Sequence, residues 1–297
     1  MQEKYRNMTP EECAARFKRN KIIYFIIYIL VLFAIGTLFL KRFFYILPLK
    51  YADPESAEIY NGLYNSIFSL FLIRVVVCLL LMIIVEAMQE LFFYGIFLTL
   101  CDPEKYINAE EILFRQNFFF RRYTGYARTR KMKLGLAYYS LEDYDTAWNY
   151  LKNIIPANPE KCSNIRILTA FTSYFYESGD KEKAAIYRAR LEQIKASSKK
   201  KNLQLDLTLD SLKIKEALDN KQFDEAKELI RKYINNHRVS QLSRMHHQYY
   251  LGLIAYETND YPEAIYRFKT SLENCSKLPF ARDAEAKLEE ICKSYHV

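Results

Sequence analysis

Two long apolar segments dominate the first hundred residues, and the rest of the chain places apolar residues at helical spacing. The first segment, residues 22–40, holds nineteen uncharged residues between Lys21 and Lys41. A helix of that length reaches about 28 Å, close to the ~30 Å hydrocarbon core of a bilayer. A removable signal peptide has a shorter apolar part that small residues follow, so we predict an uncleaved membrane span.

The second apolar segment, residues 66–100, is interrupted by Arg74, Glu86 and Glu90. We predict a span over about 67–89, with the two charged ends snorkelling towards opposite membrane faces. The alternative makes Arg74 and Glu86 parts of an intramembrane ion path. They lie about 18 Å apart along a helix and cannot pair with each other, and the first span offers no charged partner.

The sequence around these spans predicts how the chain is oriented. Thr9 followed by Pro10 is a helix-start signal, so the first helix is expected to begin before the lipid. Basic flanks favour the cytoplasm: residues 1–21 hold six Lys/Arg, the external loop 41–64 only three, and residues 115–133 seven without an acid. We therefore predict a basic amphipathic segment (1–21), a two-span membrane domain (22–100) and both termini in the cytoplasm.

The remaining two thirds of the chain contain a repeated pattern. The windows "LGLAYYSLEDYDTAWNYL" (134–151) and "LGLIAYETNDYPEAIYRF" (251–268) share seven residues at equal offsets. The same context recurs around four alanines, at spacings of 37, 42 and 38 residues: Ala147, Ala184, Ala226 and Ala264. Such a period predicts stacked helical hairpins, because one hairpin cannot bury its apolar face alone.

The pattern resembles the tetratricopeptide repeat (TPR), a helix–turn–helix unit with L-G-x-x-Y, then Ala, then Pro. In the first unit the matching residues are Leu134, Gly135, Tyr138, Ala147 and Pro159, and in the last Leu251, Gly252 and Ala264. The second and third units match at fewer positions. The resemblance implies an all-α chain, in which two transmembrane helices precede an α-solenoid of about four hairpins (128–297) and a C-terminal capping helix.

Local signals fill in this picture. Gly135 and Gly252 allow the two helices of a hairpin to approach closely, and a Glu-Asp, Gly-Asp or Asn-Asp turn supplies the second helix with an N-cap. Residues 101–127 are predicted to be a juxtamembrane linker and a helix over 108–122, capped by Asn108. Residues 280–295 read as the solvated terminal helix.

Little in the sequence indicates catalysis, so we expect no enzyme activity and no cofactor. The six cysteines form no C-x-x-C pair, and inert thiols in a reducing compartment are expected. His246 and His247 are adjacent, which does not suit a shared metal on a helix. No phosphate-binding glycine motif occurs, and the lysines of 195–202 lack the interleaved aromatic residues of a nucleic-acid site.

The resemblance implies a partner-binding role for the concave face, formed by the first helix of each hairpin. A carboxylate clamp of Lys, Arg and Asn is not evident, since Met132 and Leu136 occupy two of its positions. Aromatic anchors on this face favour an apolar or amphipathic peptide, although packing between repeats explains any single residue equally well. The concave-face set comprises Met132, Leu136, Tyr139, Thr169, Ser173, Tyr176, Tyr249, Leu253 and Tyr256.

The basic segment, residues 115–133, is a second candidate surface, for anionic lipid of the inner leaflet. Its cations are Arg115, Arg121, Arg122, Arg128, Arg130, Lys131 and Lys133. The alternative is ordinary topology with aromatic packing into the first repeat.

From these observations we expect a membrane-anchored cytosolic scaffold that binds protein or peptide partners, with neither nucleic acid nor metal. One alternative is an accessory subunit of a transport or sensing complex, which uses Arg74, Glu86 and the external loop. A weaker alternative is a membrane-docked regulator of an enzyme.

Overall fold

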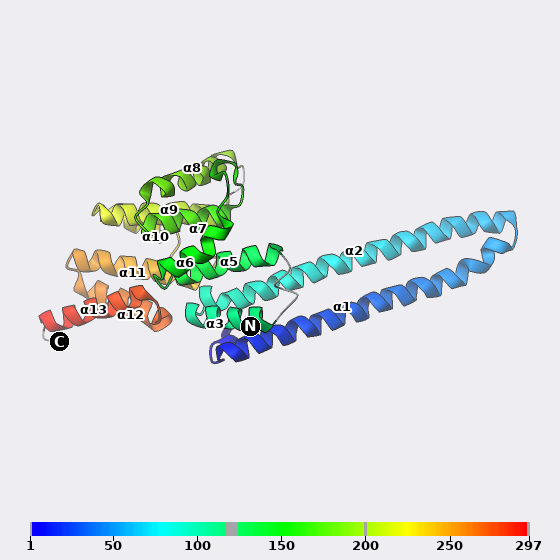
Figure 1. The fold of residues 1–297 in the computed structure, drawn as a ribbon, viewed down its shortest axis with the longest axis horizontal. Coiled ribbons are helices and arrows are strands. Elements are labelled where there is room, and N and C mark those ends of the chain that lie inside the picture. The colour runs from blue at the N-terminus through cyan, green and yellow to red at the C-terminus, as the bar shows by residue number, and fades with distance from the viewer. Residues whose placement is uncertain (1, 117–123, 199–200, 296–297) are drawn as a thin grey trace. The chain divides into compact units, whose positions relative to one another are not determined.

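The computed structural model describes residues 2–116, 124–198 and 201–295, which form twelve α-helices (Figure 1). The fold is all-α in this described part. The chain divides into two compact units, one of residues 12–93 and the other of residues 1–11 with 94–297. Each unit is described by itself.

The first unit is a helical hairpin made from α1 (Pro10–Ile46) and α2 (Pro54–Leu98). A short 3-10 turn (Leu47–Tyr51) joins them, and the Asp53 carboxylate accepts a hydrogen bond from the Ser56 backbone N–H at 2.8 Å. The predicted start at Pro10 is confirmed. Both helices are long and apolar enough to be candidate membrane spans, and most of segment 41–64, predicted as a loop, is helical.

The two hairpin helices contact each other along a narrow seam. Half-buried or buried residues recur every three or four positions on each helix, the spacing of a coiled-coil seam. Aromatic rings meet there, with centroids 4.6 Å apart for Phe39 and Phe71 and 6.0 Å apart for Phe43 and Tyr64. The faces of α1 and α2 that point away from the seam expose large apolar side chains such as Phe33. Such faces suit a lipid environment.

Three charged side chains meet at the end of the hairpin away from its connecting turn. The Lys21 ammonium lies 3.0 Å from a carboxylate oxygen of Glu90 and 3.3 Å from one of Glu86. The first span, residues 22–40, was predicted to offer no charged partner; Lys21, the residue just before that span in the same helix, does pair with Glu86. In the sequence, Lys21 stands out only as a cation that flanks the first span. Antiparallel pairing of α1 and α2 brings it next to Glu86 and Glu90, on successive turns of α2.

In the second unit the described residues form ten α-helices, of which eight form four consecutive pairs (Figure 1). The pairs are α5 (Thr124–Tyr139) with α6 (Tyr144–Leu151), α7 (Ile165–Glu177) with α8 (Lys181–Ser197), α9 (Leu203–Asp219) with α10 (Phe223–Arg231), and α11 (Gln241–Glu257) with α12 (Tyr261–Cys275). Helix α3 (Pro103–Gln116) packs on α5, and α13 (Pro279–Tyr295) packs on α12 and α11.

The predicted bounds agree with the structure for the terminal helix α13 but not for the start of α3. The terminal helix was expected over 280–295 and is found within one residue of that range. Helix α3 begins at Pro103, not at the expected cap Asn108. The Asp102 carboxylate accepts a hydrogen bond from the Lys105 backbone N–H at 3.1 Å, so Asp102 and Pro103 provide the stronger start signal.

The turn inside each pair has the same backbone conformation all four times. The residue before the second helix has φ between −82° and −86° and ψ between 64° and 74°, at Asp143, Asp180, Gln222 and Asp260. The residue before that has positive φ, from 57° to 83°. Each aspartate accepts a hydrogen bond from the backbone N–H three residues on and so caps its helix, whereas Gln222 makes no such bond.

Replacing Gln222 with aspartate is expected to stabilise the third pair by about 1 kcal/mol, because it supplies the cap that the other three turns have. Denaturant unfolding of the full chain in detergent measures this. Asp260→Ala is the matched opposite change and should lose a similar amount. An unchanged midpoint for Gln222→Asp would contradict the equivalence of the four turns.

Glycine permits the close approach of helices in the first and fourth pairs, as predicted. A Cβ atom added to Gly135 would lie 2.7 Å from Leu151, and one added to Gly252 would lie 2.6 Å from the Phe268 ring. Ala147 and Ala264 are fully buried. The two repeated windows therefore make the same contact in two different pairs.

Candidate functional site

No member of the concave-face set is exposed. Met132 is buried, and the other eight are half-buried on α5, α7 and α11. Met132, Leu136, Tyr139 and Tyr176 belong to one apolar cluster with the first two pairs, and Tyr249, Leu253 and Tyr256 belong to a second cluster with α12 and α13. Packing between neighbouring helices thus accounts for much of this set.

The polar members of the set bond to neighbouring helices. The Tyr176 hydroxyl donates to Asp219 at 3.2 Å, and Tyr256 donates to Glu290 at 2.8 Å. Thr169 shares a hydrogen bond with Thr208. Burial, and after it the carboxylate of Asp219, raises the pKa of Tyr176 to about 12. These tyrosines are therefore neutral donors whose hydroxyls hold adjacent helices together.

Tyrosines of the first and fourth pairs are half-buried and have raised pKa values. Burial, and after it the neighbouring Tyr250 of α11, raises the pKa of Tyr139 on α5. The pKa of Tyr249 is raised by burial first and then by Asp283, to which its hydroxyl donates, with a smaller contribution from Glu142 in the first turn. Tyr139 and Tyr249, predicted to line an open concave face, are thus partly covered by the domain itself.

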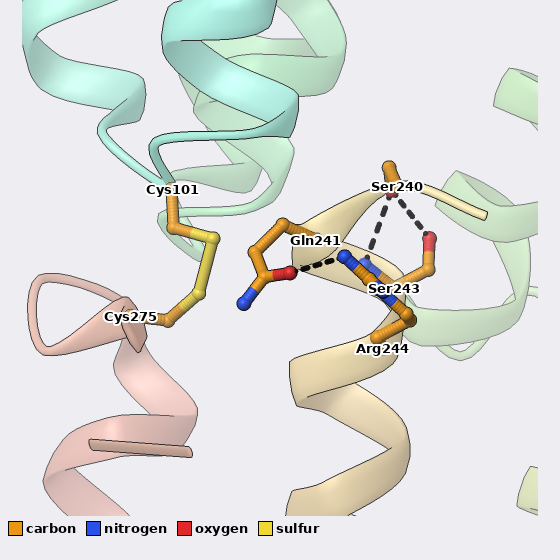
Figure 2. The surroundings of a disulfide bond; sticks show 6 residues. All are labelled: Cys101, Ser240, Gln241, Ser243, Arg244 and Cys275. Atoms are coloured by element: carbon orange, nitrogen blue, oxygen red, sulfur yellow. Dashed lines mark hydrogen bonds between the residues drawn. A yellow bond between two sulfur atoms is a disulfide. The ribbon is translucent and has the colours of Figure 1, made fainter. Parts of the chain in front are cut away.

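The two ends of the domain are joined covalently. Cys101, between α2 and α3, and Cys275, at the end of α12, form a disulfide with 5.2 Å between their Cα atoms (Figure 2). The expectation of separate thiols is wrong for this pair, because residues 174 positions apart meet in the fold. Beside the bond, the Lys277 ammonium lies 2.7 Å from the Asp102 carboxylate.

The basic segment does not form one continuous surface in the described residues. Arg115 is exposed and lies 3.4 Å from Glu111, and Arg128 is exposed. Lys131 is half-buried, and the Lys133 ammonium lies 5.1 Å from the centroid of the Tyr94 ring. Two further members of the predicted cluster, Arg121 and Arg122, lie outside the described residues.

Arg130 departs most from the role predicted for it. Its side chain is 8% exposed and lies 3.5 Å from the Glu110 carboxylate, which is 2% exposed. The guanidinium sits 4.1 Å from the centroid of the Phe114 ring, and the Tyr106 hydroxyl donates to Glu110 at 3.2 Å. Arg130 therefore joins α5 to α3 inside the protein and is not available to lipid.

Arg74 lies on the outer face of the hairpin, where its side chain is exposed among apolar residues. No ion pair to Arg74 occurs among the described residues. Glu86, its proposed functional companion, is instead paired with Lys21. The structure does not bring these two residues together.

Sequence reasoning missed a polar groove between the third and fourth pairs. It has a volume of about 400 Å³ and combines cations with carboxylates. Its charged lining consists of Lys227, Arg231, Arg267, Asp260 and Glu263. No local pattern could have indicated it, since the lining residues are spread over α10, α11 and α12.

His247 is a buried titratable group, although the sequence suggests only a metal-ligand role to test for it. It is 2% exposed, and its Nδ1 atom has no hydrogen-bond partner in the described part of the chain. Burial lowers its pKa to about 4. The adjacent His246 has its pKa lowered to about 3, by burial first and then by the charges of Lys215 and His247.

Acid should therefore destabilise the domain. An unfolded histidine takes up a proton as the pH falls through about 6.5, while folded His247 stays neutral until about 4. Between pH 7 and pH 5 this difference removes about 2 kcal/mol of folding free energy. Denaturant unfolding at both pH values should show a smaller loss for His247→Gln than for the wild type. Equal losses would contradict a neutral buried His247.

The chain matches no family model, and no curated protein and no solved structure is significantly similar to it. Among the described residues, no group of three or more His, Cys, Asp or Glu side chains could hold a metal ion. The proposed function therefore depends on the geometry of the described residues alone.

Proposed function

We propose that this protein is a membrane-anchored scaffold, whose TPR-like helix pairs hold a protein or peptide partner beside the membrane. The observation that carries the proposal is the four-fold recurrence of one helix–turn–helix unit, attached to a hairpin of two long apolar helices. Stacked pairs build extended surfaces from many side chains, which suits binding to a polypeptide.

The turn geometry supports the TPR-like assignment. Positive φ followed by an aspartate cap recurs in three pairs, and Gly135 and Gly252 contact equivalent large residues, Leu151 and Phe268. The partner surface includes the polar groove of α10–α12, which is open to solvent. The half-buried concave-face set contributes where side chains such as Ser173 reach the surface.

The proposed orientation places both termini in the cytoplasm. Its basis is the excess of Lys/Arg in residues 1–21 over the segment that joins the two spans. Lys21 then marks the cytoplasmic boundary of the first span, next to Glu86 and Glu90. The basic segment lies on the same side, where Arg115 and Arg128 can meet anionic lipid.

A photo-crosslinking amino acid placed in the full chain, in native membranes, tests the function. Suitable positions are Ser173 on the concave face and Asn235 in the groove, with Ile73 on the hairpin as the control. Protein adducts at position 173 or 235 are the expected result. Their absence at both positions would reject the scaffold.

A second candidate, an accessory subunit of a membrane complex, is favoured by the exposed position of Arg74. A neighbouring span with a carboxylate would neutralise this charge inside the bilayer. Adducts confined to position 73 in the same experiment would favour it. Because Glu86 is paired with Lys21, the candidate now depends on Arg74 alone.

A further inference from the structure

The meeting of Cys101 and Cys275 joins elements that a linear stack of helix pairs would keep apart. Their Cα atoms are 5.2 Å apart, within the usual range of about 4.4–6.8 Å for bonded cysteines. The two residues are 2% and 1% exposed. Four other cysteines (Cys13, Cys78, Cys162 and Cys292) lie outside the disulfide. Of the six cysteines, only the two that precede α3 and end α12 form a disulfide.

A noncovalent contact reinforces the same junction. Asp102 caps α3 through the Lys105 backbone N–H and also binds the Lys277 ammonium at 2.7 Å. Helix α3 packs on α5 of the first pair, while Cys275 ends α12 of the fourth pair. The disulfide and the ion pair thus fasten the first pair to the fourth.

This fastening keeps the inner aromatic residues covered. Tyr139 of the first pair and Tyr250 of the fourth are both half-buried, and burial raises the pKa of each. In an open stack, each repeat contacts only the repeats adjacent to it. Contacts between the first and fourth pairs therefore depend on the ends staying together.

We propose that Cys101 and Cys275 form a redox-controlled latch that closes the helix-pair domain and controls access to its concave face. A dithiol reductant opens the latch by exchange: the S–S bond breaks, the two cysteines gain two electrons and two protons, and the reductant becomes a disulfide. Figure 2 shows Gln241, the first residue of α11, beside the bond, and Arg244 donates a hydrogen bond to the Oε1 atom of Gln241. The reverse exchange re-forms the bond: a small-molecule disulfide takes up the two electrons and two protons and becomes two thiols.

The latch acts on the proposed binding function, but its test requires no partner. The full chain in detergent is treated with a mild oxidant, denatured without reductant and labelled with a maleimide. We expect four reactive thiols before reduction and six after it, because four cysteines lie outside the disulfide. Cys101→Ser should leave Cys275 as a fifth reactive thiol. Six reactive thiols in the oxidised wild type would overturn the proposal.

Hydrogen exchange measures the opening itself. Reduction should speed amide exchange in α5 and α11 by about tenfold or more, and Cys101→Ser should show the fast exchange without reductant. Cys162→Ser, at a half-buried free cysteine, is the matched control and should behave as the wild type. Equal exchange in the oxidised and reduced wild type would mean that the bond does not control the concave face. A failed crosslinking experiment would not change this result, so the two proposals fail separately.

The ion pair provides an independent variant. Because both sulfurs are buried, the reductant reaches them only when residues 101–102 separate from residues 275–277. Lys277→Gln should therefore raise the rate of reduction by dithiothreitol several-fold. Lys269→Gln, which changes an exposed lysine on the same helix as Cys275, should leave the rate unchanged. Equal rates for both variants would overturn the role of the ion pair in the latch.

Discussion

Replacing Glu110 with alanine should lower the free energy of unfolding by about 3–5 kcal/mol. The change leaves the guanidinium of Arg130 buried without its carboxylate, and it removes the acceptor of the Tyr106 hydroxyl. Burying an unpaired charge is among the most unfavourable single changes in a protein interior. Denaturant unfolding of the full chain in detergent, followed by the helical circular dichroism signal, measures the loss.

Two further variants separate this effect from the loss of helix α3. Glu104→Ala changes an exposed carboxylate on the same helix and should cost less than 1 kcal/mol. The double variant Glu110→Leu, Arg130→Met replaces the pair with apolar groups and should recover most of the stability. A single-variant loss below 1 kcal/mol would show that Arg130 reaches solvent, which would restore the predicted lipid contact.

Gly252→Leu should cost about 3 kcal/mol, because the new side chain overlaps the Phe268 ring in the fourth helix pair. Even a Cβ atom at this position lies 2.6 Å from the ring and 3.3 Å from the Cβ of Arg267. The two helices cannot keep their present separation. The midpoint of denaturant unfolding should therefore fall while the slope stays the same.

A double-mutant cycle tests the cause. Phe268→Ala alone leaves a cavity, yet it should relieve part of the overlap when combined with Gly252→Leu. The combined loss should thus be smaller than the sum of the single losses, by about 1 kcal/mol or more. Strict additivity would mean that Gly252 and Phe268 do not contact each other.

The features predicted well from the sequence are those set by local residues. The apolar segments became α1 and α2, and the repeated Leu-Gly window became α5 and α11. The turns follow from Asp143, Asp180 and Asp260, whose side chains bond within three residues. Short-range signals of this kind act in the same way wherever the helix lies.

The features missed depend on distant partners. Arg130 looked like a surface cation because periodicity cannot show that Glu110 faces it across two helices. Lys21 and Glu86 are 65 residues apart, and Cys101 and Cys275 are 174 apart. The half-buried state of the concave-face set has the same origin. Its tyrosines contact helices that are distant in sequence, as Tyr176 does with Asp219 and Tyr256 with Glu290.

The Lys21 contact with Glu86 and Glu90 has a consequence for membrane insertion. Arriving alone, the second apolar segment would bring two carboxylates to the bilayer edge, with only Arg74 as a cation on the same helix. Entering together with the first helix, it meets Lys21 within 3.0 Å of Glu90. If the two helices cross a membrane, insertion as a preformed hairpin would partly neutralise the charge that sequential insertion leaves exposed.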